Sequence, residues 1–411
     1  MTRPSAAPST AVSTSVAPAG TIPAGTRPRL RELDLLRFVA VAALMLHHFA
    51  GVRSTVWPGR DAQKIYPELS PVAHFGYLGV QLAFLISGFV ILMAVWDRDV
   101  ADFAVARVVR IYPAYWFSVL LSLVLYLICG SAVPYDDGAD PVRRVLPNLT
   151  MLQDGLHVAP LEVAYWVLWV ELHFYVLMAL LACVGITYAR CVTFMVSWLL
   201  IGAYAKESGS AFLGAVFLPE TAPYFIAGMA FFLIYRFGSN LALWLIIAAS
   251  WALSVNHLVN DVSPLNEWEG VHEVVIPIVV TVLYAIMALV ALRKLTWLNW
   301  RGFTVLGAIA YPLYLVHETV ARAIVKQFFP HPIIDRLTVL PVITVAALAT
   351  ACLVYWFVEK PLQRIMRPRL RAAVAQIRRN GAAPPVPPTT ETVTEPSERE
   401  PAAAAPPASV P

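Results

Sequence analysis

The sequence predicts an all-α integral membrane protein with about ten transmembrane helices, both termini cytoplasmic and a disordered tail at each end. Three observations support this fold class: the composition, the spacing of apolar windows and the placement of basic residues. Of the 411 residues, 59% are hydrophobic and 14% are charged, whereas a soluble domain carries about 25% charged residues. The chain therefore lacks the polar side chains that would cover a water-facing surface, and a soluble multidomain protein is excluded.

Apolar windows of about 20 residues, the length that crosses a bilayer as a helix, recur ten times along the chain. They fall near residues 33–52, 76–96, 110–129, 163–184, 188–205, 215–235, 239–257, 273–292, 303–325 and 336–358. The fifth and sixth windows are the least regular, because Pro219 and Pro223 interrupt the apolar pattern. The windows predict one transmembrane domain over residues 29–365.

Basic residues gather on one side of the predicted spans when the N-terminus is placed inside. The predicted cytoplasmic segments contain Arg27, Arg29, Arg31, Arg98, Arg107, Arg110, Arg190, Arg236, Arg293, Lys294, Arg301 and the basic stretch 360–379. The outer segments hold fewer basic residues, and two of these segments, 134–140 and 260–273, are acidic. This asymmetry follows the positive-inside rule and predicts an even number of spans in the cell membrane, with both ends in the cytoplasm.

The two ends have compositions that are typical of disorder. Residues 1–28 are mostly Ala, Pro, Ser and Thr, and residues 366–411 are first basic and then rich in Pro and Ala. A cleaved signal peptide is disfavoured, because the first apolar run contains Arg37, His47 and His48 and lacks an A-x-A site. None of the four cysteines belongs to a C-x-x-C pair, so free, packed thiols are predicted.

The first span carries the densest set of ionisable residues, which are costly inside a bilayer and by default indicate function. Asp34 and Arg37 are three residues apart and share one helix face. Arg37 and His48 are eleven residues apart, which places them on one stripe about 16 Å apart along the axis. His47 points about 100° away from this stripe. The alternative is a snorkelling arginine and a histidine hydrogen-bonded between helices.

Arg107 and Arg110 form a second candidate, at the start of the third span. Two guanidinium groups on one helix face suit bidentate phosphate binding. The alternative is a positive-inside anchor above the aromatic residues that follow. Ser87-Gly88 lies within an apolar window and is not part of a G-x-S-x-G motif. This pair therefore predicts close helix packing rather than a serine nucleophile.

Glu171, one turn into the fourth span, needs a partner within the bilayer. His48 and His317 are its expected partners; a purely structural interhelical bond is the alternative. Trp166 lies near Glu171, and Tyr314 and His317 share a face of the ninth span. No H-E-x-x-H, C-x-x-C, G-x-G-x-x-G or Walker motif is present. Neither a metal site nor a nucleotide-binding fold is therefore expected, and no basic stripe indicates nucleic acid.

Seven stretches, in order along the chain, resemble the acyltransferase 3 family of membrane O-acyltransferases. They are LDLLRFVAVAALMLHHF (33–49), GVQLAFLISGF (79–89), ARVVRIYPAYW (106–116), WVLWVELHFY (166–175), YFIAGM (224–229), AYPLYLVH (310–317) and VEKP (358–361). Arg37 and His48 match the family's Arg, ten residues, His pattern, and Arg107 and Arg110 match its R-x-x-R motif. Gln81 and Ala310 depart from the family pattern, and VEKP replaces V-E-R-P. An SGNH-type hydrolase domain is not found, which indicates the single-domain subgroup.

The resemblance implies transfer of an acyl group, most simply acetyl, from cytoplasmic acyl-CoA to a hydroxyl of a carbohydrate, glycolipid or related envelope or secreted acceptor. Arg37, Arg107 and Arg110 are expected to hold the coenzyme A phosphates. His48 is expected to act as a base or a transient acyl carrier, with Glu171 setting its tautomer. Tyr314, His317 and Trp166 are the expected substrate contacts.

Two rival function classes remain open at the sequence level. A secondary transporter or exporter also keeps ionisable residues in its spans, but it often has paired repeats with interrupted helices, and no such repeat is evident. A membrane scaffold or receptor gives no reason for the stripe that carries Arg37 and His48. Release of coenzyme A thiol discriminates these classes from the enzyme. The sequence does not indicate an oligomeric state.

Overall fold

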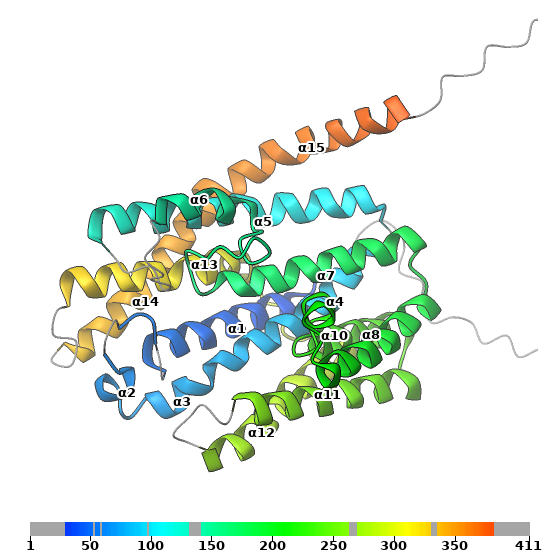
Figure 1. The fold of residues 1–411 in the computed structure, drawn as a ribbon, viewed down its shortest axis with the longest axis horizontal. Helices are drawn as coiled ribbons and strands as arrows, with labels where there is room; N and C mark the ends of the chain where they lie inside the picture. The colour runs from blue at the N-terminus through cyan, green and yellow to red at the C-terminus, as the bar shows by residue number, and fades with distance from the viewer. Residues whose placement is uncertain are drawn as a thin grey trace, which may run out of the picture.

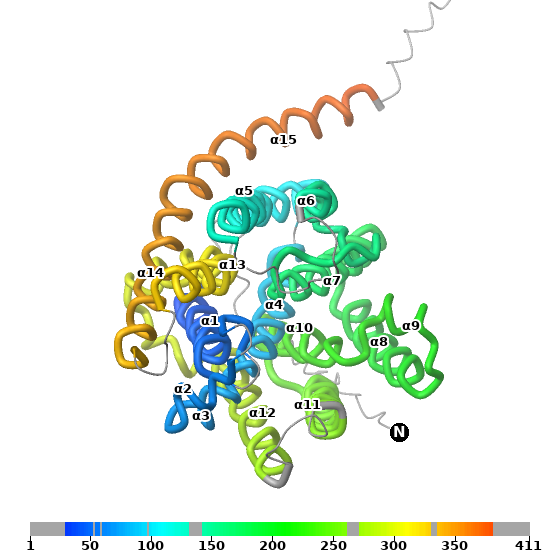
Figure 2. Tube along the Cα trace, turned by 60° about the vertical axis from the view of Figure 1, so that its left-hand side comes forward, coloured from blue at the N-terminus to red at the C-terminus, as the bar shows by residue number. Residues whose placement is uncertain are grey.

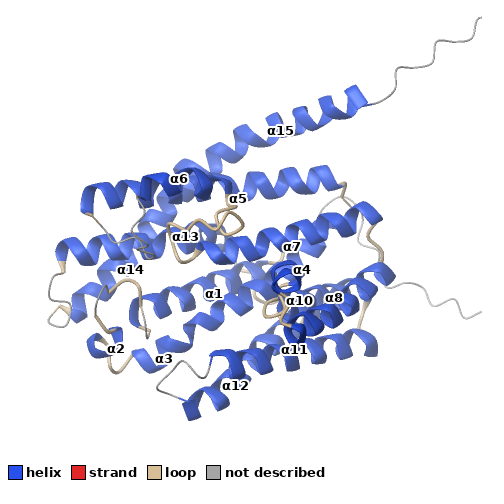
Figure 3. Ribbon diagram, viewed as in Figure 1, coloured by secondary structure: helices blue, strands red, loops and turns tan. Residues whose placement is uncertain are grey.

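The computed structural model describes residues 29–51, 54–57, 60–96, 98–130, 141–262, 269–329 and 335–381. Within these ranges every regular element is a helix (Figure 3). Among the described residues ten helices are long and apolar enough to cross a membrane, which agrees with the predicted number. The chain is thus an all-α, multi-pass membrane protein. The predicted tail over 1–28 and the Pro- and Ala-rich tail from 382 onward lie outside the described residues.

The ten spans form a bundle of roughly aligned helices (Figure 1). Their main helices are α1 (Arg31–Ala50), α4 (Gly79–Val95), α5 (Val100–Cys129), α7 (Tyr165–Val184), α8 (Tyr188–Ser208), α10 (Ala222–Phe237), α11 (Leu241–Val262), α12 (Glu269–Ala291), α13 (Gly302–Phe328) and α14 (Arg336–Leu353). The shorter elements are α2 (Ala62–Ile65), α3 (Ser70–His74), the 3₁₀ turn η1 (Phe75–Leu78), α6 (Pro141–Thr150), α9 (Ala211–Phe217), the π-helical turn η3 (Val354–Glu359) and α15 (Lys360–Gly381).

Three spans show the clearest differences from the predicted pattern. The third begins at Val100 rather than near 110, because arginines at one helix end do not stop the helix. The sixth is broken between α9 and α10 at Pro219, and Pro223 lies in the first turn of α10. The last continues through η3 into α15, so the predicted domain boundary at 365 falls inside a helix, and residues 366–381 are helical.

Helix α1 packs directly against α4 and α13, which border it in Figure 2. Two glycines permit this approach. A Cβ atom on Gly79 would lie 2.2 Å from the carbonyl oxygen of Ala40, and one on Gly307 would lie 2.6 Å from the Cβ of Asp34. We call the end of the bundle where α1 begins the Arg37 end, and the end where α1 stops the His48 end.

Helices α4 and α10 cross at a second close contact, between Gly88 and Gly228. A Cβ on Gly88 would lie 2.2 Å from the carbonyl oxygen of Phe225, and one on Gly228 would lie 2.2 Å from that of Leu85. Small residues allow backbones to approach in this way, and packing without a hydrophobic driving force depends on such contacts. The prediction that Ser87-Gly88 serves helix packing is confirmed for Gly88.

We expect Gly88→Leu to prevent correct folding, because the added side chain meets backbone atoms rather than a flexible side chain that could move. Overpacking of this kind costs about 1–3 kcal/mol or more. The measurement is the fraction of detergent-solubilised protein that elutes as a single species in gel filtration. Gly214→Leu is the control, since nothing lies within 4 Å of a Cβ there. Equal yields of the two variants would contradict the close contact.

Candidate active site

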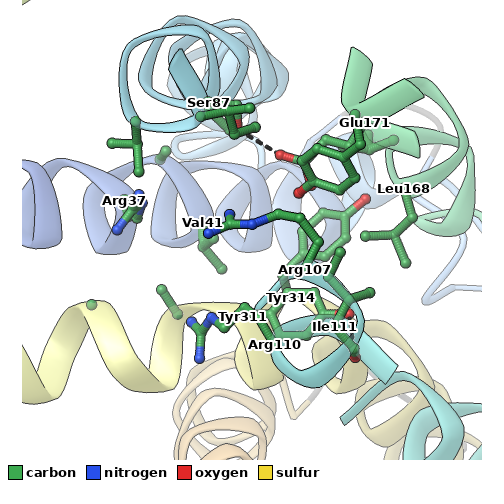
Figure 4. Close-up of a pocket in the computed structure, with 18 of the residues that line it drawn as sticks. Arg37, Val41, Ser87, Arg107, Arg110, Ile111, Leu168, Glu171, Tyr311 and Tyr314 are labelled. Carbon is green, nitrogen blue, oxygen red and sulfur yellow. Dashed lines mark hydrogen bonds between the residues drawn. The ribbon is translucent and has the colours of Figure 1, made fainter. Parts of the chain in front are cut away.

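A cavity of about 390 Å³ opens among α1, α4, α5, α7 and α13, toward the Arg37 end (Figure 4). Its polar lining contains five arginines against one carboxylate, Glu171. The arginines are Arg37, Arg98, Arg107, Arg110 and Arg367. In Figure 4 the labelled guanidinium groups gather on one side, and Leu168 and Glu171 lie on the other. A second cavity of about 340 Å³ adjoins the first and shares Arg37, Arg110 and Gly307 with it. The arrangement therefore suits an anionic ligand.

Arg37 is held at the cavity by the carboxylate of Asp34. The distance from Arg37 Nη1 to Asp34 Oδ1 is 3.4 Å, and Arg29 Nε lies 2.7 Å from the other oxygen of Asp34. The side chain of Asp34 is buried, whereas that of Arg37 is 35% exposed. The predicted shared face of Asp34 and Arg37 is confirmed, and one carboxylate serves two guanidinium groups.

Arg110 forms an ion pair with Glu359 of η3 and lies 5.7 Å from the ring centroid of Tyr311. Glu359 is fully buried, accepts a 2.9 Å hydrogen bond from Gln363, and has one oxygen without a partner among the described residues. A π-helical turn places this carboxylate beside α5, and such turns are frequent at functional sites. The ion pair of Glu359 with Arg110 was not predicted from the sequence. A glutamate at the end of an apolar span was the signal for such a partner.

Arg107 is held by aromatic rings rather than by a carboxylate. Its guanidinium lies 5.7 Å from the ring centroid of Phe103 and 6.0 Å from that of Tyr175, within cation–π distance. Its Nε is buried and has no hydrogen-bond partner within the described ranges. No ion pair of Arg107 is found in the part of the chain that the structure describes. Its charge is therefore the least neutralised of the three arginines named by the sequence motifs.

Glu171 lines the same cavity, but no contact with a histidine is found for it among the described residues. Its carboxylate accepts a 2.5 Å hydrogen bond from the hydroxyl of Ser87 and a 3.0 Å bond from that of Tyr175. The prediction that His48 or His317 is its partner, and that it sets the tautomer of His48, is wrong. Glu171 lies on the face of α7 that is directed toward Ser87 of α4, and Tyr175 lies one turn farther along the same face. Nothing in the sequence around Ser87 indicated this contact.

The cavity extends along α1 toward the His48 end. On α1 its lining reaches Leu44, one helical turn before His48, and on α13 it reaches Tyr314, one turn before His317. Tyr314 is 8% exposed and donates a hydrogen bond to the carbonyl of Ala164. From Arg37 to Leu44 the cavity follows about 10 Å of the α1 axis. An extended chain in it would point from the arginines toward the two histidines.

His48 and His317 are hydrogen-bonded between α1 and α13. His48 Nδ1 lies 2.9 Å from His317 Nε2, and the rings are parallel within 3°. His317 Nδ1 lies 3.0 Å and 2.8 Å from the carbonyl oxygens of Leu313 and Tyr314. Carbonyls only accept, so the proton of a neutral His317 is on Nδ1 and its Nε2 accepts from His48. This leaves Nε2 of His48 unprotonated, as a general base requires.

A buried charge network lies next to this pair. Glu318 Oε2 is 3.7 Å from His48 Nδ1, and Glu318 Oε1 is 3.3 Å from Arg322 Nη1. Arg322 also forms an ion pair with Glu162 of the α6–α7 connection. All three charged residues are buried, at most 4% exposed. Glu318 was not among the residues predicted to contact His48. Glu318 and Arg322, two ionisable residues four apart in the ninth span, were the signal for this contact.

His48, His317 and Glu318 are also close enough to hold a metal ion, with ligand atoms within 4.8 Å of one another. The sequence predicts no metal site. In the structure His48 and His317 share a direct hydrogen bond, and Glu318 forms an ion pair with Arg322. The negative charge of Glu318 is thus already paired with a cation of the protein.

Two further residues named from the sequence lie away from this site. Trp166 is 41% exposed, borders neither cavity and contacts Phe84 edge-on. Its predicted substrate contact has no support, because the residues of α7 that line the cavity, Val167, Leu168, Glu171 and Tyr175, share one helix face, and Trp166 lies about 100° outside it. His47 Nδ1 donates to the carbonyl of His74, 2.8 Å away, so His47 points away from the Arg37–His48 stripe as predicted.

A comparison with models of protein families finds one match. The matching model is Acyl_transf_3, described as an acyltransferase domain, and it covers residues 30–356. This range includes α1 to α14 and thus both the cavity and the histidine pair, whereas α15 follows it. No curated protein and no solved structure matches the chain.

Proposed function

Because this chain belongs to the acyltransferase family Acyl_transf_3, we propose that it is a membrane O-acyltransferase that uses acyl-CoA, most simply acetyl-CoA. The acceptor is a hydroxyl of a carbohydrate, a glycolipid or a related envelope or secreted molecule. The observation that carries this proposal is the cavity that begins among five arginines and ends one helical turn from His48. The Arg37 end faces the cytoplasm, where the positive-inside rule places its basic residues.

The arginines bind the coenzyme A phosphates in this proposal. Arg37, Arg107 and Arg110 come from two helices and converge on one cavity, and planar guanidinium groups match phosphate geometry. Asp34 and Glu359 hold Arg37 and Arg110 in place before the donor binds. The pantetheine arm extends along α1 between apolar walls that include Val41, Leu44 and Leu168, and so brings the thioester toward His48.

His48 is the catalytic base. Its Nε2 takes the proton of the acceptor hydroxyl while the alkoxide oxygen attacks the thioester carbonyl, forming a tetrahedral intermediate. The C–S bond then breaks, and the leaving thiolate takes the proton back from His48, so ester and free coenzyme A thiol form without net release of a proton. Glu318, 3.7 Å from Nδ1, stabilises the positive imidazole ring between these two steps.

The acceptor reaches His48 from the His48 end in this proposal, opposite the donor. Donor and acceptor then meet within the bundle, so an acyl group crosses part of the membrane while coenzyme A stays on the cytoplasmic side. The buried polar groups near His48, which include Glu162, Glu318 and Arg322, suit a hydroxyl-rich acceptor better than an apolar one.

The test is release of coenzyme A thiol from acetyl-CoA by the purified protein in lipid nanodiscs, with a lipid and glycan extract of the source cells as acceptor. We expect thiol release that depends on the extract and radiolabel that moves from acetyl-CoA to one extract component. The same assay with EDTA reports whether an ion at the histidine pair takes part. Binding of acetyl-CoA without any thiol release across acyl lengths and extracts would exclude the enzyme and favour a transporter.

His317 acts as a positioning residue, because its Nε2 accepts the Nδ1 proton of His48 and so fixes the tautomer. We expect His317→Leu to lower kcat about 10²-fold, within the range of general-base effects, and to leave the KM for acetyl-CoA unchanged. His317→Gln keeps a hydrogen-bond acceptor and is expected to retain more activity than His317→Leu. Steady-state kinetics in nanodiscs provide the measurement. Equal activity of both variants and the wild type would remove this role.

A further inference from the structure

We propose that Arg367 of α15, together with Arg98 at the start of α5, binds the 3′-phosphate of coenzyme A, separately from the diphosphate. This inference rests on the proposed function and deepens it, because it names the part of the donor that α15 recognises. Both arginines line the main cavity. Arg98, like Arg107 and Arg110, belongs to the segment that leads into or forms α5, whereas Arg367 lies beyond residue 356, where the family match ends.

Three ion pairs show how α15 lies along α5. Glu359 pairs with Arg110, Arg371 with Asp102 and Arg378 with Asp99. As residue numbers rise along α15 they fall along α5, so the two helices are antiparallel over this stretch. Arg367 therefore lies between the level of Arg110 and the level of Asp102, farther toward the Arg37 end than Arg110.

The distance between the two groups of arginines follows from helix geometry. Arg367 is eight residues beyond Glu359, the partner of Arg110, which is about 12 Å along α15. Arg98 precedes the first residue of α5, and Arg107 is seven residues into that helix, about 10 Å along its axis. Two independent elements thus place positive charge at the mouth of the cavity, beyond Arg107 and Arg110.

The faces of α15 explain why Arg367 points its charge toward the cavity. Lys360, Arg364, Arg367, Arg371 and Arg378 fall within an arc of about 60° when residues are spaced 100° apart. This basic face meets α5 through the ion pairs of Arg371 and Arg378. The exposed apolar side chains Ile365 and Ile377, at 50% and 71%, lie on other sides of the helix. Figure 1 shows α15 leaving the bundle obliquely along α5.

Arg367, unlike Arg371 and Arg378 on the same face, has no acidic partner among the described residues. Arg371 and Arg378 are neutralised by Asp102 and Asp99, but no hydrogen bond or ion pair of Arg367 is found among the described residues. The guanidinium is exposed and borders the cavity. In coenzyme A the 3′-phosphate is a monoester with about −1.5 to −2 charge at pH 7, like other phosphate monoesters, and it sits across the ribose from the diphosphate. A diphosphate at Arg107 and Arg110 would direct it outward, toward this charge.

The experiment compares acetyl-CoA with 3′-dephospho-acetyl-CoA as donors for the nanodisc-embedded protein, by kcat/KM. We expect the wild type to prefer acetyl-CoA at least about tenfold, mainly through KM, since hydrogen bonds between charged groups are worth this much or more. Arg367→Ala is expected to lose most of the preference by acting worse on acetyl-CoA and equally well on the dephospho donor. Arg98→Ala should act in the same direction.

Arg364→Ala is the matched control, because it removes the same charge from the same face of α15 at a residue that does not line the cavity. It is expected to keep the preference. Equal use of both donors by the wild type would overturn the subsite while leaving the acyltransferase proposal intact. The same loss of preference in Arg364→Ala would replace a specific contact by general electrostatic attraction, and would also overturn it. Failure of the wild type on both donors would instead remove the proposed function.

Discussion

His48→Gln is expected to slow coenzyme A thiol release by about 10³-fold or more, within the range that a general base contributes. The substitution removes the Nε2 lone pair that the hydrogen bonds of His317 leave free, and glutamine cannot accept a proton from the acceptor hydroxyl. The main cavity, where we propose that acetyl-CoA binds, reaches Leu44 but not His48, so the Kd for acetyl-CoA should stay the same. Thiol release gives the rate, and calorimetric binding of acetyl-CoA gives the affinity.

His47→Gln is the matched control for this result. His47 is the adjacent residue on α1, has the same side chain and contacts the carbonyl of His74 instead of His317. We expect near wild-type thiol release from this variant. If His47→Gln were inactive and His48→Gln active, the base would have to be sought at His47, where the rings of His74 and Tyr77 lie within 6 Å between centroids.

Arg107→Ala is expected to raise the KM for acetyl-CoA about 10- to 100-fold with little change in kcat. Hydrogen bonds to charged groups are worth about 1.5–3 kcal/mol, and a tenfold change in affinity corresponds to about 1.4 kcal/mol. Arg107 is substituted rather than Arg110, because removal of Arg110 would leave the buried carboxylate of Glu359 without its cation and so destabilise the fold. Initial rates at varied acetyl-CoA, at two salt concentrations, provide the measurement.

Arg190→Ala serves as the control for Arg107→Ala. Arg190 is also a basic residue at a helix end, but its guanidinium donates to the carbonyls of Val184 and Gly185 and borders neither cavity. Its KM should match that of the wild type. Arg107→Lys keeps the charge without the planar fork and should fall between the wild type and Arg107→Ala. An unchanged KM in Arg107→Ala would place the donor phosphates elsewhere.

Most of the membrane architecture could be predicted because it depends on local patterns. The ten apolar windows correspond to the ten spans, and the two proline positions mark where the sixth span breaks. The errors concern where a span begins or ends, not whether the span exists. The third span starts earlier than expected and the last runs on into α15, because basic residues are tolerated in helices that leave the bilayer.

In the candidate site, too, relations within one helix could be predicted, whereas contacts between helices could not. The spacing of Arg37 and His48 predicted that one helix carries both, and the R-x-x-R pair predicted a shared face for Arg107 and Arg110. These are relations within one helix, which the sequence determines through the helical repeat. The positions of Arg37, Arg107 and Arg110 around one cavity agree with the expected binding site, while their roles stay predictions.

The sequence thus specifies the number, kind and approximate limits of the helices, and the chemical groups that each helix carries along its faces. Which of these groups meet depends on how the helices pack. Glu318 rather than Glu171 lies beside His48, Glu359 pairs with Arg110 across 249 residues of sequence, and Arg367 lines the main cavity. The periodicity of one helix specifies its faces but not its neighbours. Apolar helices in a membrane pair through close contacts, such as that between Gly88 and Gly228, which depend on the shapes of both helix surfaces.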